Sequence, residues 1–174
     1  MGWSTWIRML TVAGILGAGL PGDSGERSFR ARLRAIQEVP TVSSPATGEF
    51  RAKVNGAETE LAYELEYSGL EGAVTQSHIH LGQSGVNGGI MIWLCGTQTN
   101  PGPAGTPACP SPGGKVSRTV TAADVVGSAA GQGVAAGEFA EALRGLRNEV
   151  SYANVHSSKF PGGEIRGQIK SDED

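Results

Sequence analysis

Apolar and polar residues alternate strictly in the first strand-like segment of the chain. In FRARLRA, residues 29–35, Phe29 and Leu33 share one side with the alanines. Arg30, Arg32 and Arg34 share the other side. Successive side chains of a β-strand point to opposite faces of its sheet, so this pattern predicts a half-buried strand.

The alternation continues on both sides of Asn55-Gly56, a dipeptide typical of β-hairpin turns. The apolar positions of the two arms are Phe50, Ala52 and Val54 before the turn, and Leu61, Tyr63, Leu65 and Tyr67 after it. Glu60, Glu64 and Glu66 occupy the polar positions of the second arm. The sequence therefore predicts a hairpin with an acidic outer face.

Further short strands are expected at residues 73–81, 90–95, 115–121, 151–160 and 163–170, with turn residues between them. Helical spacing occurs only near Phe139, Leu143 and Leu146, and Thr121 is a candidate N-cap. We predict an all-β fold, an antiparallel β-sandwich or barrel of Greek-key type. It should have seven or eight strands and one or two short helices.

The N-terminus is typical of an exported protein. Residues 9–20 form an uncharged, mostly apolar run behind Arg8, too short to span a bilayer, which predicts a signal peptide over residues 1–22. One domain should follow at residues 28–170, with an acidic tail at residues 171–174. We expect no transmembrane span in the mature protein, and a periplasmic, cell-surface or extracellular location.

Export gives the two cysteines a role. Cys95 and Cys109 enclose a segment rich in Gly, Pro and Thr, and in an oxidising compartment a disulfide that closes this loop is expected. Metal ligation by the two thiolates is the alternative. Charged residues make up only 18% of the chain and the net charge is −3, so a nucleic-acid partner is not expected.

The three histidines of the chain all occupy strand positions that face away from the neighbouring apolar residues, a property we call their strand parity. In SHIHL, His78 and His80 face one side while Ile79 and Leu81 face the other. In YANVH, Val155 faces inward and His156 outward. If the two strands are neighbours, the imidazoles should converge to within about 4 Å on the outer face, at a spacing set by metal–nitrogen bonds.

Three neutral imidazoles suit copper or zinc rather than magnesium or calcium. The alternative is that these are ordinary surface histidines without a ligand. Metal binding through neutral imidazoles should weaken below roughly pH 6, where unperturbed histidines become protonated.

A set of stretches is distributed along the chain: FRARLRAIQEVP, ATGEF, LAYELEYSGL, SHIHLGQSGVNGGI, and YANVH followed by PGGEIRGQI. Together they resemble the CHRD domain, named from chordin and found in many exported bacterial proteins. The resemblance covers residues 29–169, and its signature histidines coincide with the three that strand parity selects. In chordin these domains belong to an extracellular antagonist, which implies protein binding there.

The His-x-His pattern is also similar to the copper site of copper/zinc superoxide dismutases, which use an arginine to attract superoxide. This resemblance makes Arg166 a candidate catalytic residue, with simple pairing to Glu164 or another acid as the alternative. Tyr152 and Asn154 are candidates for hydrogen bonds that orient the ligand histidines, with a simple packing role as the alternative for Tyr152. No further histidine is left for a second, bridged metal. Glu38 is expected to be a structural carboxylate, with a ligand at the rim of the site as the alternative.

The sequence thus predicts an exported protein that binds one copper ion, or alternatively zinc, through His78, His80 and His156. A superoxide dismutase-like redox activity on superoxide or another small anion is one expectation. The alternative function is an extracellular protein-binding module, metal-free or with structural zinc.

Overall fold

The computed structural model describes Met1 and residues 27–172. The predicted signal peptide therefore lies, except for Met1, outside the described residues, as do the last two residues of the acidic tail. Asp172 and Ser171 of that tail belong to the final strand.

Nine antiparallel strands form one nearly closed sheet, which confirms the predicted all-β class. They are β1 (Arg27–Arg34), β2 (Thr47–Val54), β3 (Leu61–Ser68), β4 (Val74–Leu81), β5 (Ile90–Cys95), β6 (Gly114–Val120), β7 (Ser151–Ser157), β8 (Ile165–Gln168) and β9 (Lys170–Asp172). Their order is β5-β4-β7-β8-β1-β2-β3-β6, and β9 pairs with β1.

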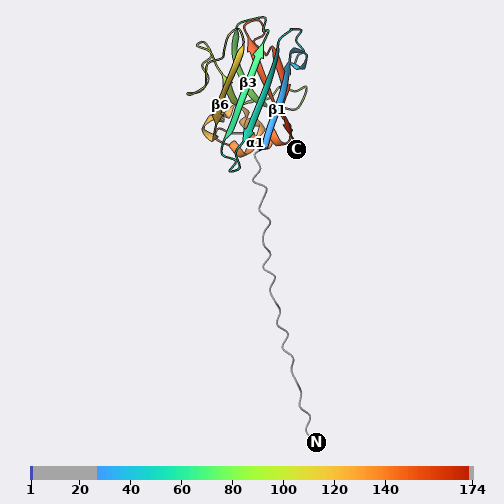
Figure 1. Cartoon of the computed structure of the whole chain (residues 1–174), viewed down its shortest axis with the longest axis vertical. Helices are drawn as coiled ribbons and strands as arrows, with labels where there is room; N and C mark the ends of the chain where they lie inside the picture. The colour runs from blue at the N-terminus through green and yellow to red at the C-terminus, as the bar shows by residue number, and fades with distance from the viewer. Residues whose placement is uncertain (2–26, 173–174) are drawn as a thin grey trace.

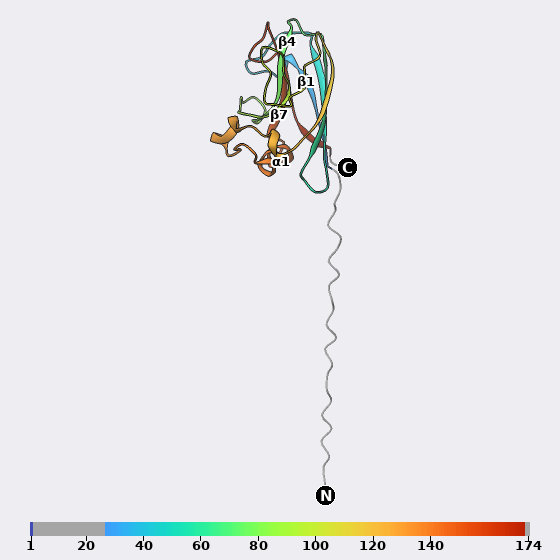
Figure 2. The same cartoon turned by 90° about the vertical axis from the view of Figure 1, so that its left-hand side faces the viewer.

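The sheet folds into two layers (Figure 1). Strands β1, β2, β3 and β6 form one layer, and β4 and β7 lie in the other, as the edge-on view shows (Figure 2). On the open side of the edge strand β5, Ile92 forms an isolated antiparallel bridge with Val125.

The apolar sides of the strands meet between the layers. Phe29, Leu33 and Phe50 are at most 1% exposed, and Ile79 and Val155 are completely buried. The alternation read from the sequence therefore placed the core correctly.

The hairpin at Asn55 has a longer turn than the Asn-Gly pair alone would need. Val54 pairs with Leu61, and the Asn55 side-chain oxygen accepts hydrogen bonds from the backbone of Thr59 and Glu60. The positive φ lies at Glu58 (56°). Asn55 closes the turn through its side chain, which a dipeptide pattern does not specify.

Helices are short and lie in the connections between strands. They are the α-helix α1 (Phe139–Arg147) and the 3-10 helices η1 (Ala35–Gln37), η2 (Ala122–Asp124) and η3 (Gly127–Gln132). Thr121 caps η2 as expected, in a capping box with Asp124. Among the described residues, no helix combines the length and apolarity that a membrane crossing requires.

Cys95 and Cys109 form the expected disulfide. It joins the end of β5 to the loop that leads into β6, and Cys95 is completely buried. Thiolate ligation by this pair is therefore excluded.

Candidate metal centre

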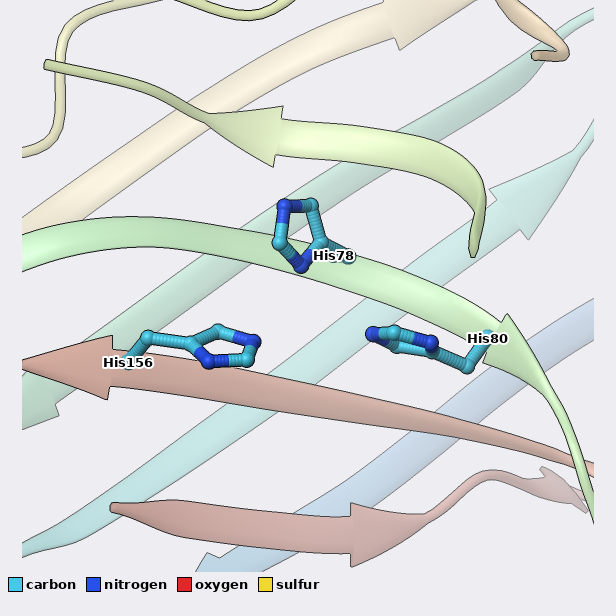
Figure 3. Close-up of side chains that lie close together, drawn as sticks. All are labelled: His78, His80 and His156. Atoms are coloured by element: carbon cyan, nitrogen blue, oxygen red, sulfur yellow. The ribbon is translucent and has the colours of Figure 1, made fainter. Parts of the chain in front are cut away.

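Two neighbouring strands bring the three histidines together. His78 and His80 project from β4, and His156 projects from β7, which pairs with β4 along its length. Figure 3 shows the three imidazoles on the same side of these strands, with their tips directed toward one another. The other layer lies behind them, so they face away from the core, as strand parity predicts.

The histidines are nevertheless buried. His78 is 1% exposed, His156 7% and His80 8%, although the sequence placed them on an outer, solvent-facing surface. Strand parity indicates the face of a sheet but not what covers that face. Here loops and a tryptophan cover it.

Backbone carbonyls orient two of the three rings. Nδ1 of His80 lies 2.9 Å from the Gly88 carbonyl oxygen, and Nδ1 of His156 lies 2.9 Å from the Pro161 carbonyl oxygen. A carbonyl only accepts hydrogen bonds, so each Nδ1 carries the proton and each Nε2 keeps its lone pair. Metal-binding histidines are commonly held by such hydrogen bonds.

Several buried ring nitrogens of the three histidines have no hydrogen-bond partner among the described residues. These atoms are Nε2 of His80, Nε2 of His156 and both ring nitrogens of His78. Buried polar atoms are normally hydrogen-bonded, and leaving them unpaired costs about 1–3 kcal/mol each. An ion that accepts three lone pairs would remove this cost.

One ligand atom from each histidine lies within 4.8 Å of the others, a group that could hold a metal ion. Bonds of about 2 Å to one ion would place the nitrogens roughly 3.4 Å apart. The observed spread is wider than that and wider than the expected limit. The ligand nitrogens would have to approach one another by up to about 1.4 Å to bind one ion.

Burial keeps the imidazoles neutral. Burial and, to a lesser extent, the nearby His156 lower the pKa of His78 to about 2 and that of His80 to about 4. Burial also lowers the pKa of His156, against the opposing effect of its bond to Pro161. Neutral rings are the form that binds a metal.

Trp93 of β5 covers His78. The two rings meet edge to face, with centroids 4.4 Å apart. Gly102, within the disulfide loop, lies so close to the indole that an added Cβ would come 2.7 Å from its Cε3. The disulfide loop therefore contributes indirectly to the cover over the histidines.

Tyr152 separates His80 from Arg166. The Tyr152 ring stacks on the His80 ring with an interplanar angle of 1° and a centroid distance of 4.7 Å. The Arg166 guanidinium carbon lies 3.3 Å from the Tyr152 centroid. Because β7 lies between β4 and β8, the tyrosine stands between the histidine and the arginine.

Arg166 is 2% exposed and binds the loop of residues 82–89. Its Nη1 donates to the Asn87 side-chain oxygen at 3.0 Å, and its Nη2 donates to the carbonyls of Val86 at 2.6 Å and Gln83 at 3.3 Å. None of these partners is Glu164 or another acid, but the charge of Glu38 acts on Arg166 without a hydrogen bond between them.

Asn154 faces His78 across the strand pair and is 3% exposed. Its Oδ1 has no hydrogen-bond partner among the described residues, which leaves one more buried acceptor beside the cluster. Glu38, also buried, lies against Gly163, and burial raises its pKa to about 7 against the opposing charge of Arg166. Glu38 is not part of the histidine group.

Sequence reasoning missed three contributors to the site: the carbonyls of Gly88 and Pro161, and the Trp93 ring. The signals for the first two were present, because GQSGVNGG and PGG mark loops beside the histidine strands. Neither motif shows which carbonyl turns inward. Trp93 became relevant only through the pairing of β4 with β5.

Comparison with protein families gave one match, to the CHRD domain, over residues 29–169. This range includes all three histidines, the disulfide and Arg166. Comparison with curated proteins and with solved structures gave no match.

Proposed function

Because the chain belongs to the CHRD domain family and brings three histidines together, we propose that it is an exported protein that binds one copper ion. His78, His80 and His156 are the proposed ligands. The disulfide supports export, since such bonds persist mainly in oxidising compartments.

One observation carries the proposal: buried imidazole nitrogens point at one another without hydrogen-bond partners. Two of the rings are held by carbonyls in the tautomer that leaves Nε2 free. A cluster with only a packing role would be expected to pair these atoms with protein groups.

The ligand set supports copper over structural zinc. Structural zinc sites almost always have four protein ligands, whereas this group contains three among the described residues. Divalent copper also binds a given nitrogen site more tightly than zinc does. Bound copper would supply one-electron redox chemistry, of the kind that superoxide dismutation requires.

The chain's own residues would exclude water and orient the ligands. Gly88 and Pro161 hold two imidazoles, while Trp93 and the loop of residues 82–89 cover the site. We propose that Arg166 acts mainly by holding that loop, because its two terminal nitrogens are engaged there. Attraction of a small anion by Arg166 stays a prediction.

The closed cover favours a second candidate function. Ligand atoms with almost no solvent exposure suit a metal that stabilises the domain, zinc included, in a module that binds an extracellular protein. A site that turns over superoxide requires the cover to open.

Titration calorimetry with copper and zinc tests the metal site. We expect sub-micromolar copper binding with one ion per chain, and loss of at least a hundredfold in affinity in His80→Ala and His156→Ala. Gln76→Ala is the matched control, because Gln76 lies on the same face of β4 but outside the histidine group. Absent binding, or binding that both histidine variants retain, would refute the proposal.

Trp93 reports where the copper binds. Trp3 and Trp6 lie within the predicted signal peptide, so Trp93 is the sole tryptophan of the mature chain. Bound Cu(II) should quench its emission, and His156→Ala should abolish that quenching. A superoxide-decay assay on copper-loaded protein then separates an enzyme from a carrier or structural site.

A further inference from the structure

Arginines dominate one face of the layer opposite the histidines. Arg30, Arg32 and Arg34 project outward from β1, and Figure 1 views the layer that contains this strand. The outward positions of the neighbouring strands add Arg51 and Lys53 from β2 and Lys170 from β9. We call these six side chains the cationic strip. The whole chain, by contrast, has a net charge of −3.

Like charges face one another across the strip. Arg30 lies opposite Arg51 on β2 and opposite Lys170 on β9. Directly opposed like charges destabilise a sheet. Exposed ion pairs of Arg30 with Asp172, Arg51 with Glu49 and Lys170 with Glu149 offset this only in part, because such pairs contribute little.

Arg32 and Arg34 have no side-chain partner within residues 27–172. The residue opposite Arg32 is Glu49, but this carboxylate accepts its hydrogen bonds from Arg51, at 2.9 and 3.1 Å. Both guanidiniums are therefore free to bind an anion. A hollow of about 380 Å³ runs beside Arg32, lined also by Arg30, Ala31, Gln168, Lys170 and the Arg51-paired Glu49.

We propose that the cationic strip binds an extended acidic polysaccharide that carries carboxylate or sulfate groups. Arginine guanidiniums bind such groups through paired hydrogen bonds. Arg30 and Arg34 are separated by about 13 Å along the strand, and a linear polymer can follow three charges spaced in this way.

Other polyanions fit the strip less well. The exposed large hydrophobic residues among those described are Met1, Ile36 and Val86, and none lies on β1, β2 or β9 to enter a membrane. The strip has no aromatic ring on which nucleic-acid bases could stack. β1 lies inside the sheet with neighbours on both sides, so an acidic peptide could not pair with it as an added strand.

The test uses a fluorescent heparin octasaccharide and polygalacturonate, titrated into the purified protein at several salt concentrations. We expect saturable binding that weakens with salt. The double variant Arg32→Gln, Arg34→Gln should lose about tenfold or more in affinity and show a shallower salt dependence, because two anion contacts disappear. Both residues are exposed, so the melting temperature should stay unchanged.

The matched control is Lys115→Gln, Arg144→Gln, which removes the same charge from side chains outside the strip. Equal losses in both double variants would show unspecific attraction and overturn the proposal. So would tighter binding to phosphatidylglycerol vesicles, duplex DNA or polyglutamate, or no binding at all. His156→Ala should bind the polysaccharide normally, so this result is independent of the metal site.

Discussion

At the residue scale, Gly88 connects the parts of the candidate site. Its carbonyl accepts the hydrogen bond from His80, and its amide donates to the Tyr152 hydroxyl at 3.3 Å. A Cβ at this position would lie 1.5 Å from the Leu81 carbonyl oxygen, so only glycine fits. The orientation of a proposed ligand thus depends on a residue without a side chain.

Arg166→Lys tests whether the arginine acts through this loop. A lysine cannot reproduce the flat stacking on Tyr152 or the divergent donors to Asn87 and Val86. We expect faster amide exchange at Gly88 in the metal-free protein and about tenfold weaker copper binding, the size typical for partners of metal ligands.

Arg118→Lys is the control for that substitution, since Arg118 pairs with Asp124 in a different part of the fold. Unchanged exchange at Gly88 in Arg166→Lys would contradict the loop-holding role. In Arg166→Gln, which removes the charge, unchanged copper affinity together with a weaker salt dependence of superoxide decay would instead point to anion attraction.

At the element scale, alternation along the strands predicted the core face but not the burial of the opposite face. β1 keeps its alternating pattern, and its arginines are exposed. β7 has the same alternation in sequence, yet all seven of its residues are buried. The difference arises because loops cover β7 on its outer side, and their conformations depend on tertiary contacts.

The disulfide loop makes a contribution to stability that can be measured by removing its disulfide. Replacing both Cys95 and Cys109 by serine should lower the free energy of unfolding by about 3 kcal/mol, the value expected for a loop of this length. Emission from Trp93 should shift to longer wavelength as Gly102 leaves the indole. Denaturant unfolding followed by fluorescence measures both effects.

Thr99→Ala, in the same loop with the disulfide intact, is the control for the serine variant. If the unfolding midpoint falls but the Trp93 emission stays in place, the loop stabilises the domain without covering the histidine site.

At the scale of the whole molecule, the buried histidines make stability depend on pH. Folding lowers their pKa values, whereas unfolded histidines bind protons near pH 6.5. Below that pH the unfolded state holds more protons, so the metal-free protein loses stability as the pH falls toward 4. The folded site should also retain metal to a lower pH than the roughly pH 6 expected from ordinary histidines.

The expected loss at pH 5 is about 2 kcal/mol for each of His78 and His80. Denaturant unfolding of metal-free protein between pH 4 and pH 8 measures this slope. His156→Gln should reduce it, because burial lowers the pKa of His156 as well, while Gln76→Ala should leave it unchanged. A stability that does not vary between pH 5 and pH 7 would show that the imidazoles are hydrated rather than buried.

The sequence by itself determined the strand pattern, the core side of each strand and the shared face of the three histidines. Each follows from the two-residue period of a β-strand, which is a local property of the chain. Tertiary structure alone decided that β4 and β7 are neighbours and that the carbonyls of Gly88 and Pro161 turn toward the histidines. It also decided that Tyr152 lies between His80 and Arg166. These arrangements join residues far apart in the sequence, and no local period specifies such contacts.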